Sequence, residues 1–458
     1  MFNISLVVLG KFIALVSRIL NLGNGSTWPG HVALNVNKNF IKEIIGMNQH
    51  LKIILIAGTN GKTTTGKLIQ TILEKAKYRV FQNESGANLL NGIASTLIRH
   101  SNIVTKINYD LAIFEVDENT LPLILKEIIP DYLILLNLFR DQLDRYGEIN
   151  TIANKWEDAI GHLLPKTKLI LNADDPQIAY LGKSRGVLSS TSSRWNHIDT
   201  PVFYFGLDDK TLNQISHEHA VDSTYCPNCS SKLHYHSIYY SHLGDWQCKN
   251  CDYKRPKIIF SNPPPSSLKG IYNKYNILAA VLVSKNIGIS DEKINSSIKT
   301  FTPAFGRQEI LSTNGKKVQI FLSKNPTGFN ESLRTISDLN AKNLLIVLND
   351  RIPDGRDVSW IWDVDFEDYV DQFESIIISG DRCYDMGIRI KYAQTQNSIR
   401  QLTDKSQNYN SKLKTYESLK DGIEEALLEI SNSETLYILP TYSAMLEVRK
   451  ILTGKKIL

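Results

Sequence analysis

A glycine- and threonine-rich turn directly follows an apolar run, and this pairing constrains the fold more than any other feature. Residues 53–65 read I-I-L-I-A-G-T-N-G-K-T-T-T. An apolar strand that enters such a turn and continues as a helix presents backbone N–H groups and the positive end of the helix dipole to an anion. The alternative is a turn without a ligand, but a lysine and three threonines at a helix start are costly without an anion. The sequence therefore predicts a phosphate-binding loop.

The loop assigns roles to individual side chains. Lys62 is expected to reach the β- and γ-phosphates of a nucleotide, and the Thr63 hydroxyl to ligate Mg²⁺. Ile56 occupies the place of the first glycine in the G-x-x-x-x-G-K-[ST] pattern, so the loop is a variant form. The predicted nucleotide-binding residues of the loop are Gly58, Thr59, Asn60, Gly61, Lys62, Thr63 and Thr64.

Alternating apolar runs and helical patterns predict an α/β protein of more than one domain. A chain of 458 residues is too long for one hydrophobic core. Residues 1–48 are expected to form a helical lead-in. Residues 49–310 should form a parallel sheet with helices on both faces, and residues 311–458 a smaller Rossmann-like unit. The expected strands are 53–57, 111–115, 132–137 and 169–172 in the first unit, and 319–322, 344–348, 375–379 and 435–439 in the second.

The N-terminal segment has two interpretations. Residues 6–22 are largely apolar but contain Lys11 and Arg18, and the run is short for a helix that spans a membrane. No small-residue cleavage site follows, so a signal peptide is not expected. The segment is either a helix that packs on the core or a helix that lies at a membrane surface. We expect a cytoplasmic protein, with the inner face of the membrane as the alternative position.

Four of the five cysteines form two C-x-x-C pairs within an insertion over residues 222–256. Cys226, Cys229, Cys248 and Cys251 give the spacing C-x₂-C-x₁₈-C-x₂-C. Such spacing brings four thiolates around one tetrahedral Zn²⁺, and this predicts a structural site because no coordination position stays open. So few cysteines indicate a reducing compartment rather than a disulfide scaffold.

Histidines and aromatic residues accompany these cysteines. His234, His236 and His242 are expected in loops, although one of them could replace a cysteine as a ligand. The neighbouring aromatic residues could stack nucleic-acid bases, as in other zinc ribbons, or pack the small core. We expect core packing by Tyr239, Tyr240 and Trp246, because a net charge of +5 does not indicate a nucleic-acid binder.

The expected strand 111–115 ends in carboxylates. Glu115 belongs to the same predicted sheet as the phosphate loop. Mg²⁺ prefers carboxylate and phosphate oxygens, so Glu115 and Thr63 together predict a magnesium site. Without the phosphate loop upstream, a solvated strand end would be the simpler interpretation.

Further segments give the chain a family resemblance. The loop A-G-T-N-G-K-T-T-T resembles that of the Mur ligase superfamily, and segments 137–148, 172–176, 270–280 and 303–309 resemble later motifs in the same order. Gln142 departs from the pattern, because most of those enzymes carry histidine there. The resemblance implies that Glu115 holds the metal, that Asn276 contacts the nucleotide and that Arg307 approaches the ATP phosphates.

Within that superfamily the chain is most similar to the MurT type. Segments 138–148, 324–330, 349–363 and 439–446 carry this similarity, together with the cysteine-rich insertion. It implies ATP-dependent amidation of the D-glutamate α-carboxylate of lipid II through an acyl phosphate, with ammonia from a GatD-like glutaminase partner. It also implies that an aspartate assists the partner's cysteine–histidine pair. Asp354 and Asp357 are the candidates, and spacing does not choose between them.

Two other functions are compatible with part of this pattern. A Mur or folylpolyglutamate-type ligase would add an amino acid rather than ammonia, and segment 357–363 and the cysteine-rich insertion argue against it. A zinc-ribbon NTPase that binds nucleic acid is disfavoured by the mild charge and the lack of a basic stretch. Cys383 lacks a nucleophile motif and is expected to be a buried thiol, so the chain should rely on a separate glutaminase.

Overall fold

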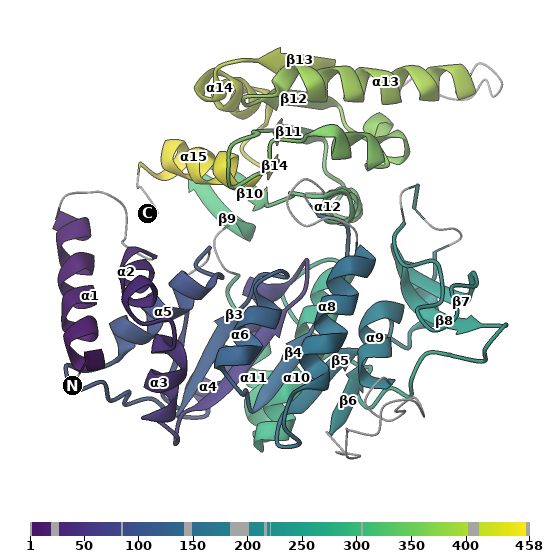
Figure 1. Cartoon of the computed structure of the whole chain (residues 1–458). Helices are drawn as coiled ribbons and strands as arrows, with labels where there is room; N and C mark the ends of the chain where they lie inside the picture. Colours follow the sequence, from purple (N-terminus) through teal and green to yellow (C-terminus); the bar gives the residue numbers. More distant parts are fainter. Residues whose placement is uncertain are drawn as a thin grey trace.

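The chain folds around two six-stranded sheets that lie one above the other (Figure 1). The computed structural model describes residues 2–19, 27–83, 86–141, 149–183, 201–214, 218–219, 221–303, 306–401 and 412–454. Residues 142–148 and 304–305, which belong to two of the motifs above, lie outside the described residues. The expected α/β class, with two sheet-containing units, is confirmed.

The first sheet is entirely parallel, with the strand order β2-β3-β1-β4-β5-β6. Its strands are β1 (Lys52–Ala57), β2 (Val80–Gln82), β3 (Leu111–Glu115), β4 (Tyr132–Leu135), β5 (Lys168–Asn172) and β6 (Val202–Phe205). The four expected strands are present, with β4 ending at Leu135 rather than at residue 137. The short edge strands β2 and β6 were not anticipated.

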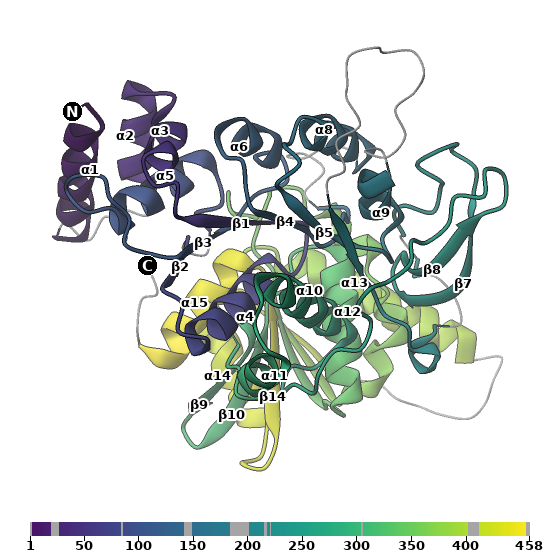
Figure 2. The ribbon, with the colours of Figure 1, turned by 90° about the horizontal axis from the view of Figure 1, so that it is seen from below.

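Two cores cover the two faces of this sheet. Alternate residues of β1 enter different cores, because successive side chains of a strand point to opposite faces: Ile53 and Leu55 lie in one, Ile54 and Ile56 in the other. One face carries α4 (Lys62–Lys75), α10 (Ile271–Ile287) and α11 (Asp291–Lys299). The other carries α5 (Leu90–His100), α6 (Leu121–Glu127), α8 (Ile149–Gly161) and α9 (Pro176–Lys183) (Figure 2).

The N-terminal segment adds three helices at the β2 side of the molecule (Figure 2). They are α1 (Phe2–Ile19), α2 (Trp28–Val36) and α3 (Phe40–Gly46), and each packs against α5. Leu6, Val7 and Phe40 are buried in the first core. Core packing is therefore confirmed for the inner side of α1. Among the described residues, no helix is long and apolar enough to cross a membrane.

The cysteine-rich insertion forms a hairpin at the β6 side. Strands β7 (Leu233–Tyr240) and β8 (Leu243–Cys248) pair antiparallel, and the short 3₁₀ helix η1 (Lys210–Leu212) precedes them. The expectation that the three histidines lie in loops is wrong for His234 and His236, which lie on β7. Trp246 packs beside the cysteines, whereas Tyr239 and Tyr240 are buried in the core of the first sheet.

The second sheet has the order β13-β12-β11-β14-β10-β9. Its strands are β9 (Arg307–Thr313), β10 (Lys316–Phe321), β11 (Asn343–Val347), β12 (Ser375–Ser379), β13 (Lys412–Tyr416) and β14 (Thr435–Pro440). Strand β9 pairs antiparallel with β10 through a turn in which Asn314 and Gly315 both have positive φ. The expected boundary at residue 310 therefore falls inside β9.

Helices also cover both faces of the second sheet. Helices α12 (Pro326–Asp338) and α13 (Cys383–Gln401) lie on one face, and α14 (Leu419–Glu429) and α15 (Tyr442–Thr453) on the other. Three 3₁₀ turns link β11 to β12, namely η2 (Ser359–Asp363), η3 (Phe366–Asp368) and η4 (Val370–Gln372). Cys383 is buried at the start of α13, as expected.

Truncation of a side chain in the central sheet should destabilise the protein. Leu133 on β4 is fully buried in the first core, whereas Leu428 on α14 is 76% exposed. Leu133→Ala should lower the free energy of unfolding by about 3 kcal/mol, because it leaves a cavity that the sheet cannot close. The matched Leu428→Ala should cost less than about 0.5 kcal/mol. Urea unfolding of both variants measures the difference, and equal losses would contradict the described packing.

Candidate active site

Two glycines shape the loop between β1 and α4. Gly58 has φ 142° and Gly61 has φ 93°, a backbone region that favours glycine. A Cβ on Gly58 would lie 2.9 Å from Leu136 Cβ, and one on Gly61 would lie 2.1 Å from Asn276 Oδ1. Side chains at these positions would clash. The loop therefore presents bare backbone at the N-terminus of α4, which is the arrangement that accommodates a phosphate.

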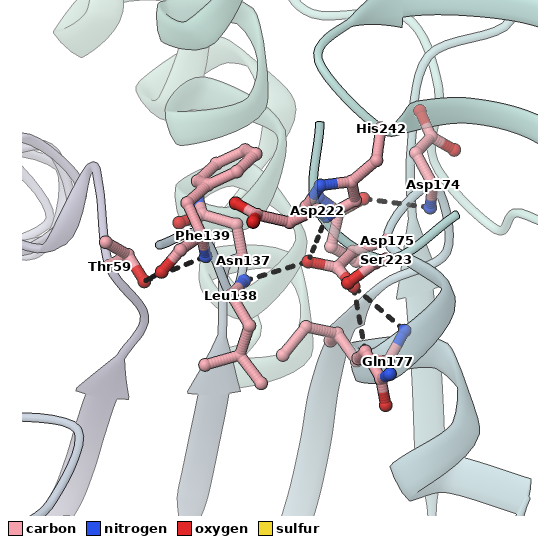
Figure 3. A network of polar contacts seen from close by, with 12 residues as sticks. Thr59, Asn137, Leu138, Phe139, Asp174, Asp175, Gln177, Asp222, Ser223 and His242 are labelled. Carbon is pink, nitrogen blue, oxygen red and sulfur yellow. Dashed lines mark hydrogen bonds and ion pairs between the residues drawn. The ribbon is translucent and has the colours of Figure 1, made fainter. Parts of the chain in front are cut away.

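The side chain of Asn137 fixes this loop against the end of β4. Asn137 Oδ1 accepts a hydrogen bond from Asn60 N at 2.9 Å, and Asn137 Nδ2 donates to Asn60 O at 3.1 Å. Beside this pair, the Thr59 hydroxyl donates to Phe139 O and accepts from Phe139 N (Figure 3). Thr59 and Asn60 are thus held by the chain that follows β4.

The Lys62 ammonium lies at the mouth of the loop. It donates to the carbonyl of Gly58 and lies 3.0 Å from Glu118 Oε1. Glu118 is itself buried, and its carbonyl accepts a 2.8 Å hydrogen bond from Trp156 Nε1. The lysine is therefore directed across the loop rather than into solvent. Glu118 was not singled out from the sequence, because only the fold brings the segment after β3 next to Lys62.

Glu115 and Thr63 meet at the ends of β3 and α4. Thr63 Oγ1 donates to Glu115 Oε2 at 2.8 Å, and Gln82 Nε2 donates to Glu115 Oε1 at 2.8 Å. Burial raises the pKa of the Glu115 carboxyl, while the Thr63 hydrogen bond and the positive charge of Arg307 oppose that rise. A hydroxyl and a carboxylate this close are the oxygen ligands that Mg²⁺ prefers.

A small cavity beside the loop is lined by both units of the chain. It has a volume of about 70 Å³ and is lined by Gly61 and Asn276 of the first unit, and by Arg307 and Glu331 of the second. Arg307 lies on β9, and burial lowers the pKa of its guanidinium. Asn276 Oδ1 accepts from Thr65 Oγ1 at 3.3 Å, so α10 contacts the start of α4. The structure brings the predicted loop, Glu115, Asn276 and Arg307 together here.

Polar contacts close the second unit over the loop. Asn325 caps α12 by accepting a 2.8 Å hydrogen bond from Gly328 N. The same side chain donates to Asn60 Oδ1 at 3.2 Å. Lys324 forms an ion pair with Asp141, which follows β4. These three chain segments are distant in sequence, so their meeting was not predictable from local motifs.

The cysteine-rich hairpin reaches the same region through His242. This histidine is fully buried at the turn between β7 and β8, and its Nε2 lies 3.2 Å from Asp175 Oδ2. Asp175 also accepts from Leu138 N at 2.8 Å and from Gln177 N at 2.9 Å (Figure 3). His242 thus connects the hairpin to Asp175 and lies outside the cysteine cluster.

Asp174 anchors the chain on both sides of the hairpin. It lies 2.8 Å from Arg255 Nε and accepts from Tyr275 OH at 2.6 Å and from Leu207 N at 2.8 Å. Burial raises the pKa of the Asp174 carboxyl to about 6, and Arg255 opposes that rise. The pair Asp174 and Asp175 therefore ties the insertion and α10 to the end of β5.

The four cysteines form a compact cluster at the far end of the hairpin. The Sγ atoms of Cys226, Cys229, Cys248 and Cys251 all lie within 4.8 Å of one another. This donor set fits a tetrahedral metal with sulfur ligands. Among the described residues, no other group of three or more histidine, cysteine or carboxylate side chains forms such a cluster.

Asp354 and Asp357 differ in exposure, although they lie in one loop after β11. Asp354 is buried, accepts a 2.8 Å hydrogen bond from Ser443 N, and is also bonded by the Ser443 hydroxyl. Burial raises the pKa of Asp354. Asp357 is exposed and accepts from Ser359 N at 2.8 Å, which lowers its pKa. Asp354 therefore braces the start of α15, whereas Asp357 faces solvent.

Two family models match this chain. The Mur ligase middle domain matches residues 56–284, and the MurT ligase C-terminal domain matches residues 322–445. The lipid II isoglutaminyl synthase (glutamine-hydrolyzing) subunit MurT of Staphylococcus aureus strain COL is 33% identical over 400 residues, which cover 82% of this chain and 84% of that protein. The corresponding subunit of Streptococcus pneumoniae (strain ATCC BAA-255 / R6) is 32% identical over 457 residues, which cover 95% of this chain and 94% of that protein.

Solved structures share the fold. A pseudomurein peptide ligase type C from Methanothermus fervidus superposes with a TM-score of 0.62 at 20% identity, covering 90% of this chain and 81% of that chain. The MurF ligase from Thermotoga maritima in complex with ADP superposes with a TM-score of 0.57 at 11% identity, covering 92% and 82%. From the two family models and the identity to relatives over most of its length, the chain belongs to the MurT family of Mur ligase relatives.

Proposed function

We propose that this chain is the ligase subunit of a lipid II isoglutaminyl synthase. It uses ATP to convert the D-glutamate α-carboxylate of lipid II into the amide, with ammonia as the nitrogen source. The observation that carries the proposal is the phosphate loop with Lys62 over its mouth and the Thr63–Glu115 pair beside it. Similarity over most of the chain to curated MurT subunits supports the choice of substrate.

The chemistry follows from the charges around the loop. A carboxylate oxygen of the substrate attacks the γ-phosphorus of ATP, ADP leaves, and ammonia then displaces inorganic phosphate from the acyl phosphate to give the amide. Lys62 and Arg307 stabilise negative charge on the transferring phosphoryl group, since both cations border the loop or its cavity. Thr63 and Glu115 would hold Mg²⁺, which supplies further charge neutralisation.

The second unit completes the site. Lys324 and Asn325 reach the first unit at Asp141 and Asn60, so closing the two units keeps water from the acyl phosphate. The accompanying organisation is a helical lead-in over residues 1–48 and an ATP-binding domain from residue 49 with an insertion at 222–256. We start the C-terminal domain, expected over residues 311–458, at β9, because β9 pairs with β10 in the second sheet. We place the enzyme in the cytoplasm, where ATP is available.

The cysteine cluster fits a structural Zn²⁺. Its four thiols supply all the ligands of a tetrahedral site, so no position stays open for substrate. The hairpin it stabilises carries His242 to Asp175. Zinc thereby supports the active-site region through packing rather than through chemistry.

A separate GatD-like glutaminase subunit supplies the ammonia. Asp357 is exposed on the loop after β11 and only one of its carboxylate oxygens accepts the hydrogen bond from Ser359 N, so we infer that the other orients a histidine on that partner. Asp354 is buried and accepts a hydrogen bond from Ser443 of the same chain. Of the two aspartates considered from the sequence, we therefore assign the partner-facing role to Asp357 and a bracing role to Asp354.

Lys62→Ala should lower ATP-dependent amidation of lipid II by at least about a hundredfold, because it removes positive charge from the phosphoryl group in transfer. Lys67→Ala, on the exposed side of the same helix, is the matched control and should keep full activity. Amidated product measured by mass spectrometry, with ammonium as the nitrogen source, tests both variants. Near-normal turnover by Lys62→Ala would rule out the assigned phosphate loop.

Protein purified without chelator should contain one zinc ion per chain, and Cys226→Ser should lower both the zinc content and the melting temperature. Cys383→Ser is the matched control, since Cys383 is buried outside the cluster and should not affect zinc. Elemental analysis and thermal unfolding provide the readouts. A zinc-free wild-type protein would refute the metal assignment.

Asp357→Asn should lower glutamine-dependent amidation by roughly a hundredfold or more, because the partner histidine loses its orienting carboxylate. Ammonium-dependent amidation by the same variant should stay near the wild-type rate. Asp354→Asn should instead lower the melting temperature and weaken both activities, because it disrupts the contact with Ser443. Equal losses by Asp357→Asn with both nitrogen sources would place that residue in the ligase site instead.

A further inference from the structure

Helix α1 carries an exposed apolar strip that the fold leaves uncovered. Seven large apolar side chains on this helix are exposed: Phe2, Ile4, Val8, Leu9, Phe12, Leu15 and Ile19. Five of them, Ile4, Val8, Phe12, Leu15 and Ile19, follow the spacing of one helix face. A contiguous apolar surface of this kind marks an interaction site rather than ordinary surface composition.

The strip cannot turn inward, because the other side of α1 is fixed. Gly10 is buried against α5, where an added Cβ would lie 2.9 Å from two atoms of Ile98. The neighbouring helix α2 also packs closely on α5, since Gly30 N donates to Ser95 Oγ at 2.8 Å. Asn3 donates to Glu43 at 2.7 Å at the start of the helix. Helix α1 lies at the edge of the molecule (Figure 2). These contacts fix the side of α1 that faces the rest of the protein, so the exposed apolar strip faces outward in the folded state.

Positive charge borders the apolar strip. The first 42 residues contain four lysines and arginines and no aspartate or glutamate. A cavity of about 210 Å³ lies between α1, α2 and α5, and it is lined by Lys11 and Arg99 together with Leu15 of the strip. Trp28, which is 60% exposed, begins α2 next to this cavity. Basic residues and an exposed tryptophan beside an apolar helix face are typical of helices that lie in the headgroup region of an anionic membrane.

We propose that α1 binds the surface of an anionic lipid bilayer, with the strip of Ile4, Val8, Phe12, Leu15 and Ile19 among the acyl chains and Lys11 and Arg99 near the lipid phosphates. The proposal deepens the proposed function, because a lipid-linked substrate is presented at such a surface. Helix α1 packs on α5. Asn83, in the segment between β2 and α5, donates through Nδ2 to the carbonyl of Glu115 at the end of β3, at 2.9 Å. The bound surface thus lies on the side of the molecule that leads to Glu115.

Vesicle sedimentation tests the proposal without any catalytic step. The full chain, with its partner if the two copurify, is mixed with vesicles of phosphatidylcholine containing phosphatidylglycerol, or with vesicles of phosphatidylcholine alone. The wild-type protein should bind the anionic vesicles more tightly. The double variant Val8→Glu/Phe12→Glu should bind them at least about tenfold more weakly. The control Ile259→Glu/Leu428→Glu adds the same charge at exposed apolar positions elsewhere and should bind as the wild type does.

The outcomes separate this proposal from others. Failure of the wild-type protein to bind anionic vesicles, or equal binding by the strip variant, would overturn it. A wild-type dimer that the strip variant converts to a monomer, without vesicle binding, would instead show that a second copy covers the strip. Phe12→Ser provides a milder test if the double variant does not fold. Amidation of lipid II in detergent should be retained by the strip variant, so loss of vesicle binding is distinguishable from failure of the ligase proposal.

Discussion

The hydrogen-bonded clasp between Asn137 and the backbone of Asn60 is the contact on which the candidate site depends. A loop that binds an anion must keep its N–H groups free, so few of them can be fixed by ordinary secondary structure. The side chain of Asn137 fixes the loop without secondary structure, because it forms hydrogen bonds with both the N–H and the C=O of Asn60. The loop is held in shape by the neighbouring strand end, while its remaining backbone faces the N-terminus of α4. The start of α4 then positions Lys62 and Thr63, and the end of β3 positions Glu115.

The cysteine-rich insertion contacts the residues that follow β5, next to the chain that follows β4. Its hairpin turn buries His242 against Asp175, and its return segment places Arg255 on Asp174. Two adjacent buried carboxylates repel one another, so each needs its own partner to be tolerated in the core. The insertion supplies a partner to each. Asp175 in turn accepts a hydrogen bond from Leu138 N, one residue after Asn137, and this links the insertion to the clasp.

Some of this arrangement could be predicted from the sequence, and some could not. The strands β1, β3, β4 and β5 are runs of apolar residues long enough to stand out, and the phosphate loop has a distinctive composition. Strand β9 was missed because its exposed and half-buried residues follow no apolar run, and its role depends on pairing with β10.

The contacts of Lys62 with Glu118 and of Asn60 with Asn325 join segments far apart in the chain. The sequence patterns do not encode such distances, because they depend on the strand order and on how the two sheets face each other. The exposed side of α1 could not be identified from periodicity, since large apolar residues lie on both the buried and the exposed sides of this helix.

The cavity between the two units is small, and this limits what can bind beside the loop in the arrangement described. Pockets for drug-sized ligands occupy about 300–1,000 Å³, whereas the cavity lined by Gly61, Asn276 and Arg307 has a volume of about 70 Å³. Under the proposed function, ATP binding requires the second unit to move away from the loop. The contacts between the units include Asn60 with Asn325, Lys324 with Asp141, Arg140 with Asp363, and Arg334 with Glu218. These contacts are hydrogen bonds and ion pairs between side chains. Under the proposed function, we expect nucleotide binding to exchange some of these contacts for contacts to phosphate.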